Sequence, residues 1–304
     1  MLNTHQANRL RVVFTTANPL SSGMVVQAIC EEDVQPVGFV LDTGPTKLSR
    51  RSAPQVELPR WKRVILEARL AACFPRAYVP RVLGLVGIHT RSFYERLRRE
   101  EDRLLKFISN ECGDHYSELI AATVRRFPTF VEAARSHGQE LLTVDNINSE
   151  AAAEFIAKCR PDVIVSLGDR IIKPNILSIP RLGVLNGHSS LLPKYRGTST
   201  EFWQIVAGEI ETGVTIHWMS ARVDEGRILV QKRWPIQRGA SHWQLRALSQ
   251  FMRVPAWREA IRLVASGFEG TPQSASEQKT FGQPQLSDLC EFYLVKHGQP
   301  NRSR

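Results

Sequence analysis

The stretch RLRVVFTTANPLSSGMVVQAICEEDVQPVGFVL, residues 9–41, contains the order of elements that decides the fold. Its apolar run Arg9–Thr15 predicts a buried strand, and Val37–Leu41 predicts a second one. Between them, a turn rich in Ser, Asn, Pro and Gly at 17–23 precedes an apolar helix predicted over Met24–Glu31. This order is typical of a βαβ unit, in which the two strands lie parallel in one sheet.

The same alternation returns after residue 138. It predicts, in chain order, strands and helices at 141–144, 149–159, 163–167, 168–177 and 183–185. Farther along, 214–219 and 226–234 alternate like an antiparallel pair that extends the sheet, and two amphipathic helices are expected within 241–267. The sequence therefore predicts an α/β fold: a Rossmann-like, mostly parallel sheet with helices on both faces and a short helical C-terminal extension.

A basic segment interrupts this pattern and is predicted to be a helical insertion at about residues 43–138. Between residues 47 and 126 there are 17 Lys and Arg against 9 Asp and Glu, which accounts for +8 of the net charge of +10. An amphipathic helix expected over Arg91–Asn110 either packs on the sheet or binds a nucleic acid or membrane surface. We expect one domain over residues 1–285, insertion included, and a tail over 286–304.

Composition places the chain among soluble cytoplasmic proteins. Hydrophobic residues make up 42% of its 304 residues and charged residues 23%, which is close to the average for globular domains. The five cysteines are widely spaced and include no CxxC pair, so we expect reduced thiols rather than a disulfide framework or a zinc site. A polar N-terminus and the absence of a long apolar run predict neither a secretory signal nor a transmembrane helix.

The candidate catalytic residues lie mainly in the stretch LNGHSSLLPKYRG, residues 185–197. Asn186 and His188 follow a predicted strand two residues apart, so both side chains point to one side of the sheet. The carboxyl ends of strands in α/β sheets are where ligands bind. An amide and an imidazole on one face can stabilise an oxyanion during acyl transfer, and an acidic residue on a later turn can tune the imidazole.

The pattern Asn-x-His-x-Ser-Leu-Leu-Pro-x-x-x-Gly resembles the signature of the 10-formyltetrahydrofolate-dependent formyltransferases. That family includes glycinamide ribonucleotide, methionyl-tRNA and amino-sugar formyltransferases, together with the hydrolytic formyltetrahydrofolate deformylases. Two further segments, Glu211–Thr215 and Val223–Gly226, resemble later family segments in the same order, and Asp224 follows His188 at the family's spacing. The resemblance covers roughly residues 140–285 well and Arg9–Leu41 more loosely.

The resemblance implies roles for individual residues. Asn186 and His188 would stabilise the oxyanion, while Asp224 would order a water molecule or assist proton removal. The 10-formyltetrahydrofolate co-substrate would bind mainly through backbone groups, and no metal is implied. The folate-binding residues expected from the resemblance are Leu167, Gly168, Asp169, Arg170, Ile171, Ile172, Arg222, Val223, Glu225 and Gly226.

Three departures from the family pattern affect these expectations. Glu225 occupies a position where many relatives have a small residue, and Gly168-Asp169-Arg170 is more charged than the usual apolar lip. The C-terminal barrel with which tRNA formyltransferases hold tRNA is not recognisable after the catalytic domain. The resemblance therefore favours a small-molecule amine over tRNA as the acceptor.

The residues that would contact this acceptor follow the first strand and the motif. They are Ser21, Ser22, Gly23, Ser189, Ser190, Thr198 and Ser199. The N-terminal turn could bind a phosphate or carboxylate through backbone NH groups, or Ser21 or Ser22 could simply cap the helix.

The leading hypothesis is N-formylation of a small primary amine, such as an amino sugar nucleotide or an amino-acid derivative. The alternatives are a formyltetrahydrofolate deformylase, a methionyl-tRNA formyltransferase-like enzyme, and a non-catalytic protein that binds RNA or a membrane surface through the basic insertion. The oligomeric state is left open, with a homodimer among the options.

Overall fold

The computed structural model describes residues 9–44, 128–168, 170–238, 240, 242–274 and 279–282. At the centre of these residues is a seven-stranded sheet with the order β3-β2-β1-β4-β5-β7-β8. Its strands are β1 (Leu10–Thr16), β2 (Val34–Asp42), β3 (Leu141–Val144), β4 (Val163–Ser166), β5 (Gly183–His188), β7 (Glu211–Trp218) and β8 (Ile228–Pro235). The strands from β3 to β5 are parallel, whereas β7 and β8 are antiparallel, as predicted.

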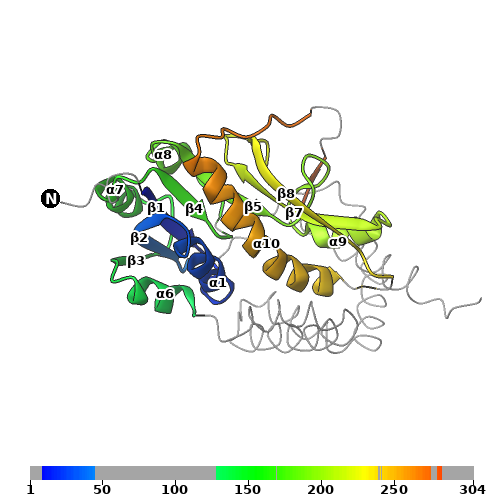
Figure 1. The fold of residues 1–304 in the computed structure, drawn as a ribbon, viewed down its shortest axis with the longest axis horizontal. Helices are drawn as coiled ribbons and strands as arrows, with labels where there is room; N and C mark the ends of the chain where they lie inside the picture. The colour runs from blue at the N-terminus through cyan, green and yellow to red at the C-terminus, as the bar shows by residue number, and fades with distance from the viewer. Residues whose placement is uncertain are drawn as a thin grey trace, which may run out of the picture.

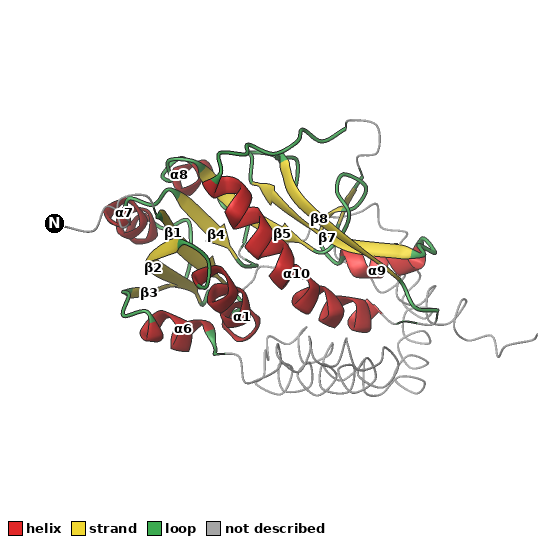
Figure 2. Ribbon diagram, in the orientation of Figure 1, coloured by secondary structure: helices red, strands yellow, loops and turns green. Residues whose placement is uncertain are grey.

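Helices cover both faces of the sheet, which confirms the predicted fold class (Figures 1 and 2). The helices are α1 (Pro19–Cys30), α6 (Phe130–Ser136), α7 (Glu150–Cys159), α8 (Pro174–Leu177), α9 (Thr200–Val206) and α10 (His242–Ala265). Helices α1, α6 and α10 share one apolar core with the sheet, and α7 and α8 share a second core on the opposite face.

The alternation of strand side chains divides residues between these two cores. Val12 and Phe14 of β1 lie in the core under α1, whereas Val13 between them lies in the core under α7. The Phe14 ring stacks on Phe39 with centroids 5.3 Å apart. Because β1 is buried on both faces, its centre at Val12–Phe14 is an apolar run rather than an alternation, which is typical of a central parallel strand.

Helix α1 begins earlier than the sequence indicates. Its first residue is Pro19 rather than Met24, so the predicted turn at 17–23 is wrong for most of its length. Proline suits the first helical position because its fixed φ is already helical and its missing NH needs no partner there. Ser22 and Gly23 therefore lie inside the helix, and neither serine acts as its cap, since Asn18 occupies the N-cap position.

A second correction concerns the region after β8. The sequence predicts two helices within 241–267, but α10 runs through it as one helix with Pro255 in its interior. An interior proline removes one backbone hydrogen bond. The residues that follow it, Ala256, Trp257 and Ala260, are completely buried against the sheet, and this burial offsets the loss.

Most of the predicted insertion and the tail lie outside the described residues, including the amphipathic helix expected over residues 91–110. At the end of the predicted insertion, α6 begins at Phe130, where Thr129 and Glu132 form a reciprocal capping box. The domain bounds at 285 and 286 stay a prediction. Among the helices described, none combines the length and apolarity needed to cross a bilayer.

Candidate functional site

The carboxyl end of β5 presents Asn186 and His188 on one face of the sheet, as the strand period predicts. Gly187 between them faces α10, and a Cβ added there would lie 3.0 Å from Nε1 of Trp257. The antiparallel register places His217 of β7 opposite Asn186 and Thr215 opposite His188. Strand pairing therefore brings residues that are about 30 positions apart in sequence to one site.

Four side chains meet at this site. The Asn186 Nδ2 atom lies 3.5 Å from Nε2 of His217. The two Asp224 carboxylate oxygens face the two imidazoles, with Oδ2 3.5 Å from Nδ1 of His188 and Oδ1 3.6 Å from Nε2 of His217. Both histidines are almost fully buried, and the Asp224 side chain is only 10% exposed. The structure thus brings together Asn186, His188 and Asp224, and it adds His217 between them.

The tautomer of His188 follows from its second contact. Its Nε2 atom lies 2.5 Å from the carbonyl oxygen of Tyr195. Because a carbonyl oxygen can only accept, Nε2 carries the proton, and in the neutral ring Nδ1 is left as a lone pair facing Asp224. Burial lowers the pKa of His188 below 6.5, although the charge of Asp224 opposes this shift. The neutral ring is therefore the resting form at neutral pH.

Asp224 is held ionised. Burial by itself raises its pKa, but the His188 and His217 imidazoles and a 2.8 Å hydrogen bond from the Gly197 backbone NH bring the pKa down to about 2. The residue also has a positive φ of 53°, a backbone conformation that is costly for a non-glycine residue. Such a conformation persists only where the surroundings fix it.

The surroundings that fix Asp224 are built around the buried Arg196. Its NH1 atom donates to Oε1 of Glu225 over 2.8 Å, and its NH2 atom donates to Oε1 of Gln273 over 2.9 Å. Gln273 in turn donates from Nε2 to the carbonyl oxygens of Asp224 and Gly226, at 2.9 and 2.7 Å. The Arg196–Glu225–Gln273 clamp thus holds the backbone on both sides of Glu225. Glu225 points into this clamp, although the resemblance placed it in the folate pocket.

We expect Arg196→Met to lower the free energy of unfolding by about 3 kcal/mol, because it leaves the Glu225 carboxylate without its buried partner. Urea unfolding followed by circular dichroism measures this. Arg233→Met, which removes an exposed pair with Glu211, is the matched control and should cost less than about 1 kcal/mol. Equal losses in the two variants would show that the clamp contributes nothing beyond a surface ion pair.

The residues expected to bind folate fall into two loops. Ile171 and Val223 are 71% and 43% exposed and belong to the few large apolar side chains that the described residues expose. Arg222 is also exposed. By contrast, Leu167 and Ile172 are buried, and Gly226 packs directly on the backbone of Trp218. Exposed apolar side chains on both loops suit a flat aromatic ligand.

Arg170, expected at the lip of that pocket, points elsewhere. Its NH2 atom donates to Oδ1 of Asp42 over 3.0 Å and to the carbonyl oxygen of Asp145 over 3.2 Å. Asp42 is buried at the end of β2, so the arginine neutralises its charge. Asp169 lies outside the described residues, and Gly168 is exposed with a positive φ of 87°.

Several residues expected to contact the acceptor are used within the protein. Ser22 is buried, and its hydroxyl bonds Thr16 Oγ1 and the Asn18 carbonyl, each at 2.7 Å. A Cβ on Gly23 would overlap the backbone of Pro128 and Thr129, so this side of Gly23 is packed against that segment. Ser190 is buried and donates to the Tyr195 carbonyl over 2.7 Å. The Ser22 and Ser190 side chains are thus used within the protein, and contact of these three residues with an acceptor stays a prediction.

The other acceptor candidates surround α9. Thr198 is exposed, and Ser199 is the N-cap of α9 with a positive φ of 54°. Ser189 is half-buried between α9 and α10. The side chain of Ser21 lies outside the described residues.

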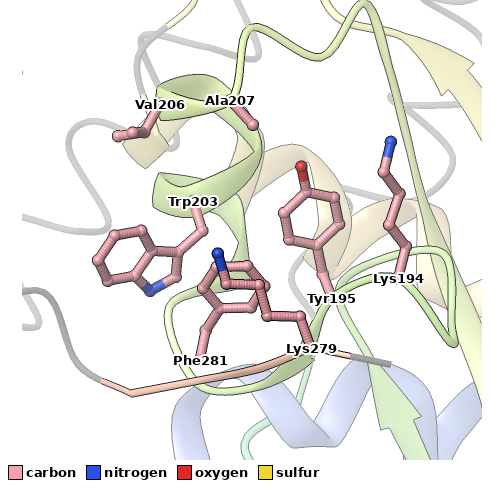
Figure 3. Close-up of a pocket in the computed structure, with 7 residues that line it drawn as sticks. All are labelled: Lys194, Tyr195, Trp203, Val206, Ala207, Lys279 and Phe281. Atoms are coloured by element: carbon pink, nitrogen blue, oxygen red, sulfur yellow. The ribbon is translucent and has the colours of Figure 1, made fainter. Parts of the chain in front are cut away.

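The short strands β6 (Arg196–Gly197) and β9 (Thr280–Phe281) pair in parallel, and β6 contacts the site through the Gly197 NH that donates to Asp224. Figure 3 shows the Phe281 ring between Tyr195 and Trp203, with ring centroids 5.2 and 5.4 Å apart and Lys279 over the ring face. These residues line a shallow cavity of about 540 Å³. Their packing fixes Tyr195, whose carbonyl oxygen orients both His188 and Ser190.

Sequence reasoning missed His217, Arg196 and Gln273. The signal for His217 was available, because it alternates with apolar residues in the strand predicted at 214–219 and therefore had to face either a core or a site. Nothing in the local sequence points to Gln273, which reaches the Asp224 loop from a segment 49 residues away. Within the described residues, no group of three or more His, Cys, Asp or Glu side chains could hold a metal ion.

Part of the sequence matches known formyltransferases. The sequence profile of the formyl transferase family matches residues 118–254. The methionyl-tRNA formyltransferase of Chlorobium chlorochromatii is 46% identical over 93 residues, covering 31% of this chain and 30% of that protein. The bifunctional polymyxin resistance protein ArnA of Wigglesworthia glossinidia brevipalpis is 40% identical over 125 residues, covering 41% and 18%. The alignments span less than half the length of these curated relatives.

Solved structures share the fold at low sequence identity. Glycinamide ribonucleotide transformylase 1 from Symbiobacterium toebii has a TM-score of 0.52 at 20% identity, covering 86% of this chain and 90% of that chain. An N-formyltransferase from Helicobacter canadensis, solved with folinic acid and dTDP-3-aminofucose, has a TM-score of 0.52 at 14% identity, covering 90% and 71%. The sheet shares its fold with these structures, and the match to the formyl transferase family model covers β5, β7 and the Asp224 loop.

Proposed function

We propose that the protein transfers a formyl group from 10-formyltetrahydrofolate to the primary amine of a small acceptor. The observation that carries this proposal is the cluster of Asn186, His188 and Asp224 at the carboxyl end of β5, with His188 Nδ1 3.5 Å from the ionised carboxylate. Exposed Ile171 and Val223 on the two neighbouring loops fit the aromatic rings of a folate. 10-Formyltetrahydrofolate supplies the activated formyl group.

The residues of the cluster divide the chemistry among them. The Asn186 amide, a neutral donor, is suited to stabilise the negative charge that develops on the formyl oxygen. His188, neutral and with Nε2–H fixed by Tyr195, offers Nδ1 as the base that accepts a proton from the attacking amine. Asp224 then stabilises the resulting imidazolium. This assigns His188 to proton transfer, whereas the sequence alone suggested oxyanion stabilisation for it.

A small amine remains our preferred acceptor, while tRNA stays a competing one. The relatives that match in sequence include methionyl-tRNA formyltransferases, and a structural neighbour was solved with an amino sugar nucleotide. Both acceptors are those of the related proteins themselves.

Product mass spectrometry tests the proposal. Incubation with 10-formyltetrahydrofolate and a panel of amines and tRNA should give one acceptor that gains a single formyl group, with stoichiometric release of tetrahydrofolate. Asn186→Ala should lower the rate about 10²-fold, because it removes one oxyanion donor. Formate release without any acceptor would instead identify a deformylase, and no turnover of the folate at all would refute the proposed function.

A further inference from the structure

His217 lies on β7 beside the candidate catalytic cluster, and the chemistry proposed above gives it no role. It is 1% exposed and pairs with Asn186 across the antiparallel strands β5 and β7. Side chains of directly paired residues project from the same face of a sheet and lie next to each other. Buried polar groups are normally hydrogen-bonded, so the partners of the two ring nitrogens decide what this histidine does.

The contact on one side of the His217 ring fixes where its proton is. Nδ1 lies 2.8 Å from the carbonyl oxygen of Trp218. A carbonyl oxygen can only accept, so Nδ1 carries a hydrogen and donates it. The bond made by one ring nitrogen sets the state of the other. In the neutral ring, Nε2 is therefore left as an acceptor.

Two groups lie near this acceptor. The Nδ2 atom of Asn186 is 3.5 Å from Nε2, and the Oδ1 atom of Asp224 is 3.6 Å from it. Of the two, only the amide can donate to the neutral ring, because a carboxylate oxygen carries no hydrogen. A separation of 3.5 Å is long for a hydrogen bond, but contacts in catalytic sites are often long before ligands bind and tighten in the complex.

This arrangement favours one orientation of the Asn186 amide. An asparagine side chain can exchange the positions of its oxygen and its NH2 group by a half turn, since the two ends are nearly equal in size. The Nε2 lone pair of His217 attracts the NH2 group and repels the oxygen, and the negative charge of Asp224 lies on the same side. A turned amide would bring three acceptor atoms together.

We propose that His217 is a positioning residue that holds the Asn186 amide with its NH2 group available to the reacting carbonyl. One amide hydrogen is donated to Nε2 of His217, and the other is left for the formyl oxygen, on which negative charge develops. This rests on the formyl transfer proposed above and adds to it a residue that acts through Asn186 rather than on the substrates.

Two substitutions of His217 separate the roles of its two nitrogens. The amide of His217→Gln reaches the position of Nε2 and keeps an acceptor for Asn186, whereas that of His217→Asn reaches only the position of Nδ1. We expect His217→Asn to lower kcat about tenfold or more, though by no more than Asn186→Ala, and His217→Gln to stay within about threefold of wild type. KM for donor and acceptor should change by less than about twofold in both, because a binding contact is not removed.

Thr212→Val is the matched control for loss of a buried polar contact on the same strand. It removes the 2.6 Å hydrogen bond that Thr212 Oγ1 donates to Gln204 Oε1. It should lower the free energy of unfolding, measured with urea, and keep the wild-type kcat. A loss of kcat in Thr212→Val equal to that in His217→Asn would overturn the inference, because any weakened contact on β7 would then slow the protein.

Double variants identify the residue through which His217 acts. Added to Asn186→Ala, His217→Asn should cause no further loss of kcat. Added to Asp224→Asn, it should cause its full loss, because the two changes affect different groups. The reverse pattern would assign His217 to Asp224 and overturn the inference, as would a His217→Gln variant that folds but is as slow as His217→Asn.

Nitrogen NMR of the full chain with isotope-labelled histidine tests the same contact without donor or acceptor. Above neutral pH, the His217 signals, identified by their loss in His217→Gln, should show a protonated Nδ1 and an unprotonated Nε2. The Nε2 signal should shift in Asn186→Ala and stay in place in His137→Ala. A protonated Nε2, or a signal that ignores Asn186→Ala, would contradict the proposed contact.

The two kinds of measurement separate this inference from the proposed function. If NMR shows the contact but no formylated product forms, the proposed reaction fails while the contact between His217 and Asn186 stands. If product forms but His217→Gln does not restore the rate, the reaction stands and the positioning role fails.

Discussion

Replacing His188 by alanine should lower kcat for formyl transfer about 10⁴-fold, the upper end of what one positioned general base contributes. The ring is neutral, its Nε2–H is fixed on the Tyr195 carbonyl, and Nδ1 faces the site. His217 also faces Asp224, but it does so from the other carboxylate oxygen, Oδ1. Single-turnover measurement of tetrahydrofolate formation at saturating donor and acceptor determines the rate.

The control for this variant is His137→Ala, which removes a half-buried histidine at the end of α6, far from the site in sequence and fold. It should have wild-type kcat. Circular dichroism should show that both variants are folded, since Ser190 still occupies the Tyr195 carbonyl when the imidazole is lost. A rate for His188→Ala within tenfold of wild type would remove His188 from the chemistry.

Asp224→Asn should lower kcat about 10³-fold and shift the pH profile. The wild-type rate should rise with pH through the pKa of His188, because only the neutral ring accepts a proton. The charge of Asp224 raises that pKa, so its removal lowers the pKa and moves the rising limb to lower pH. Asp224 itself, with a pKa of about 2, stays ionised throughout and adds no limb near neutrality.

The matched control is Asp33→Asn, which neutralises an exposed carboxylate paired with Arg9 and should leave both rate and profile unchanged. The double variant His188→Ala/Asp224→Asn should be no slower than His188→Ala alone, because Asp224 acts through the imidazole. If the rising limb of the pH–rate profile moves to higher pH in Asp224→Asn, the Asp224 charge does not raise the pKa of His188 as proposed. Additive losses in the double variant would give the two residues separate roles.

The local pattern of the sequence was sufficient to predict the strands of the sheet. Apolar runs such as Val163–Ser166 identify buried strands because both faces of a parallel sheet must be covered. The strand period of two is enough to place Asn186 and His188 on the same face. Helix boundaries could be predicted less well from the sequence. A proline is favoured both in turns and in the first turn of a helix, and the prediction of a turn at Pro19 was wrong.

The sequence by itself determined the order of strands and helices, the motif at 186–197 and the family resemblance, because each depends on residues close together in the chain. Only the tertiary structure decided that His217 joins the cluster, that Glu225 faces Arg196 rather than a ligand, and that Ser22 and Ser190 are buried. The first two outcomes depend on strand register and on side chains that meet across 29 and 31 residues of sequence. Contacts over such separations are set by packing, which no local pattern of residues records.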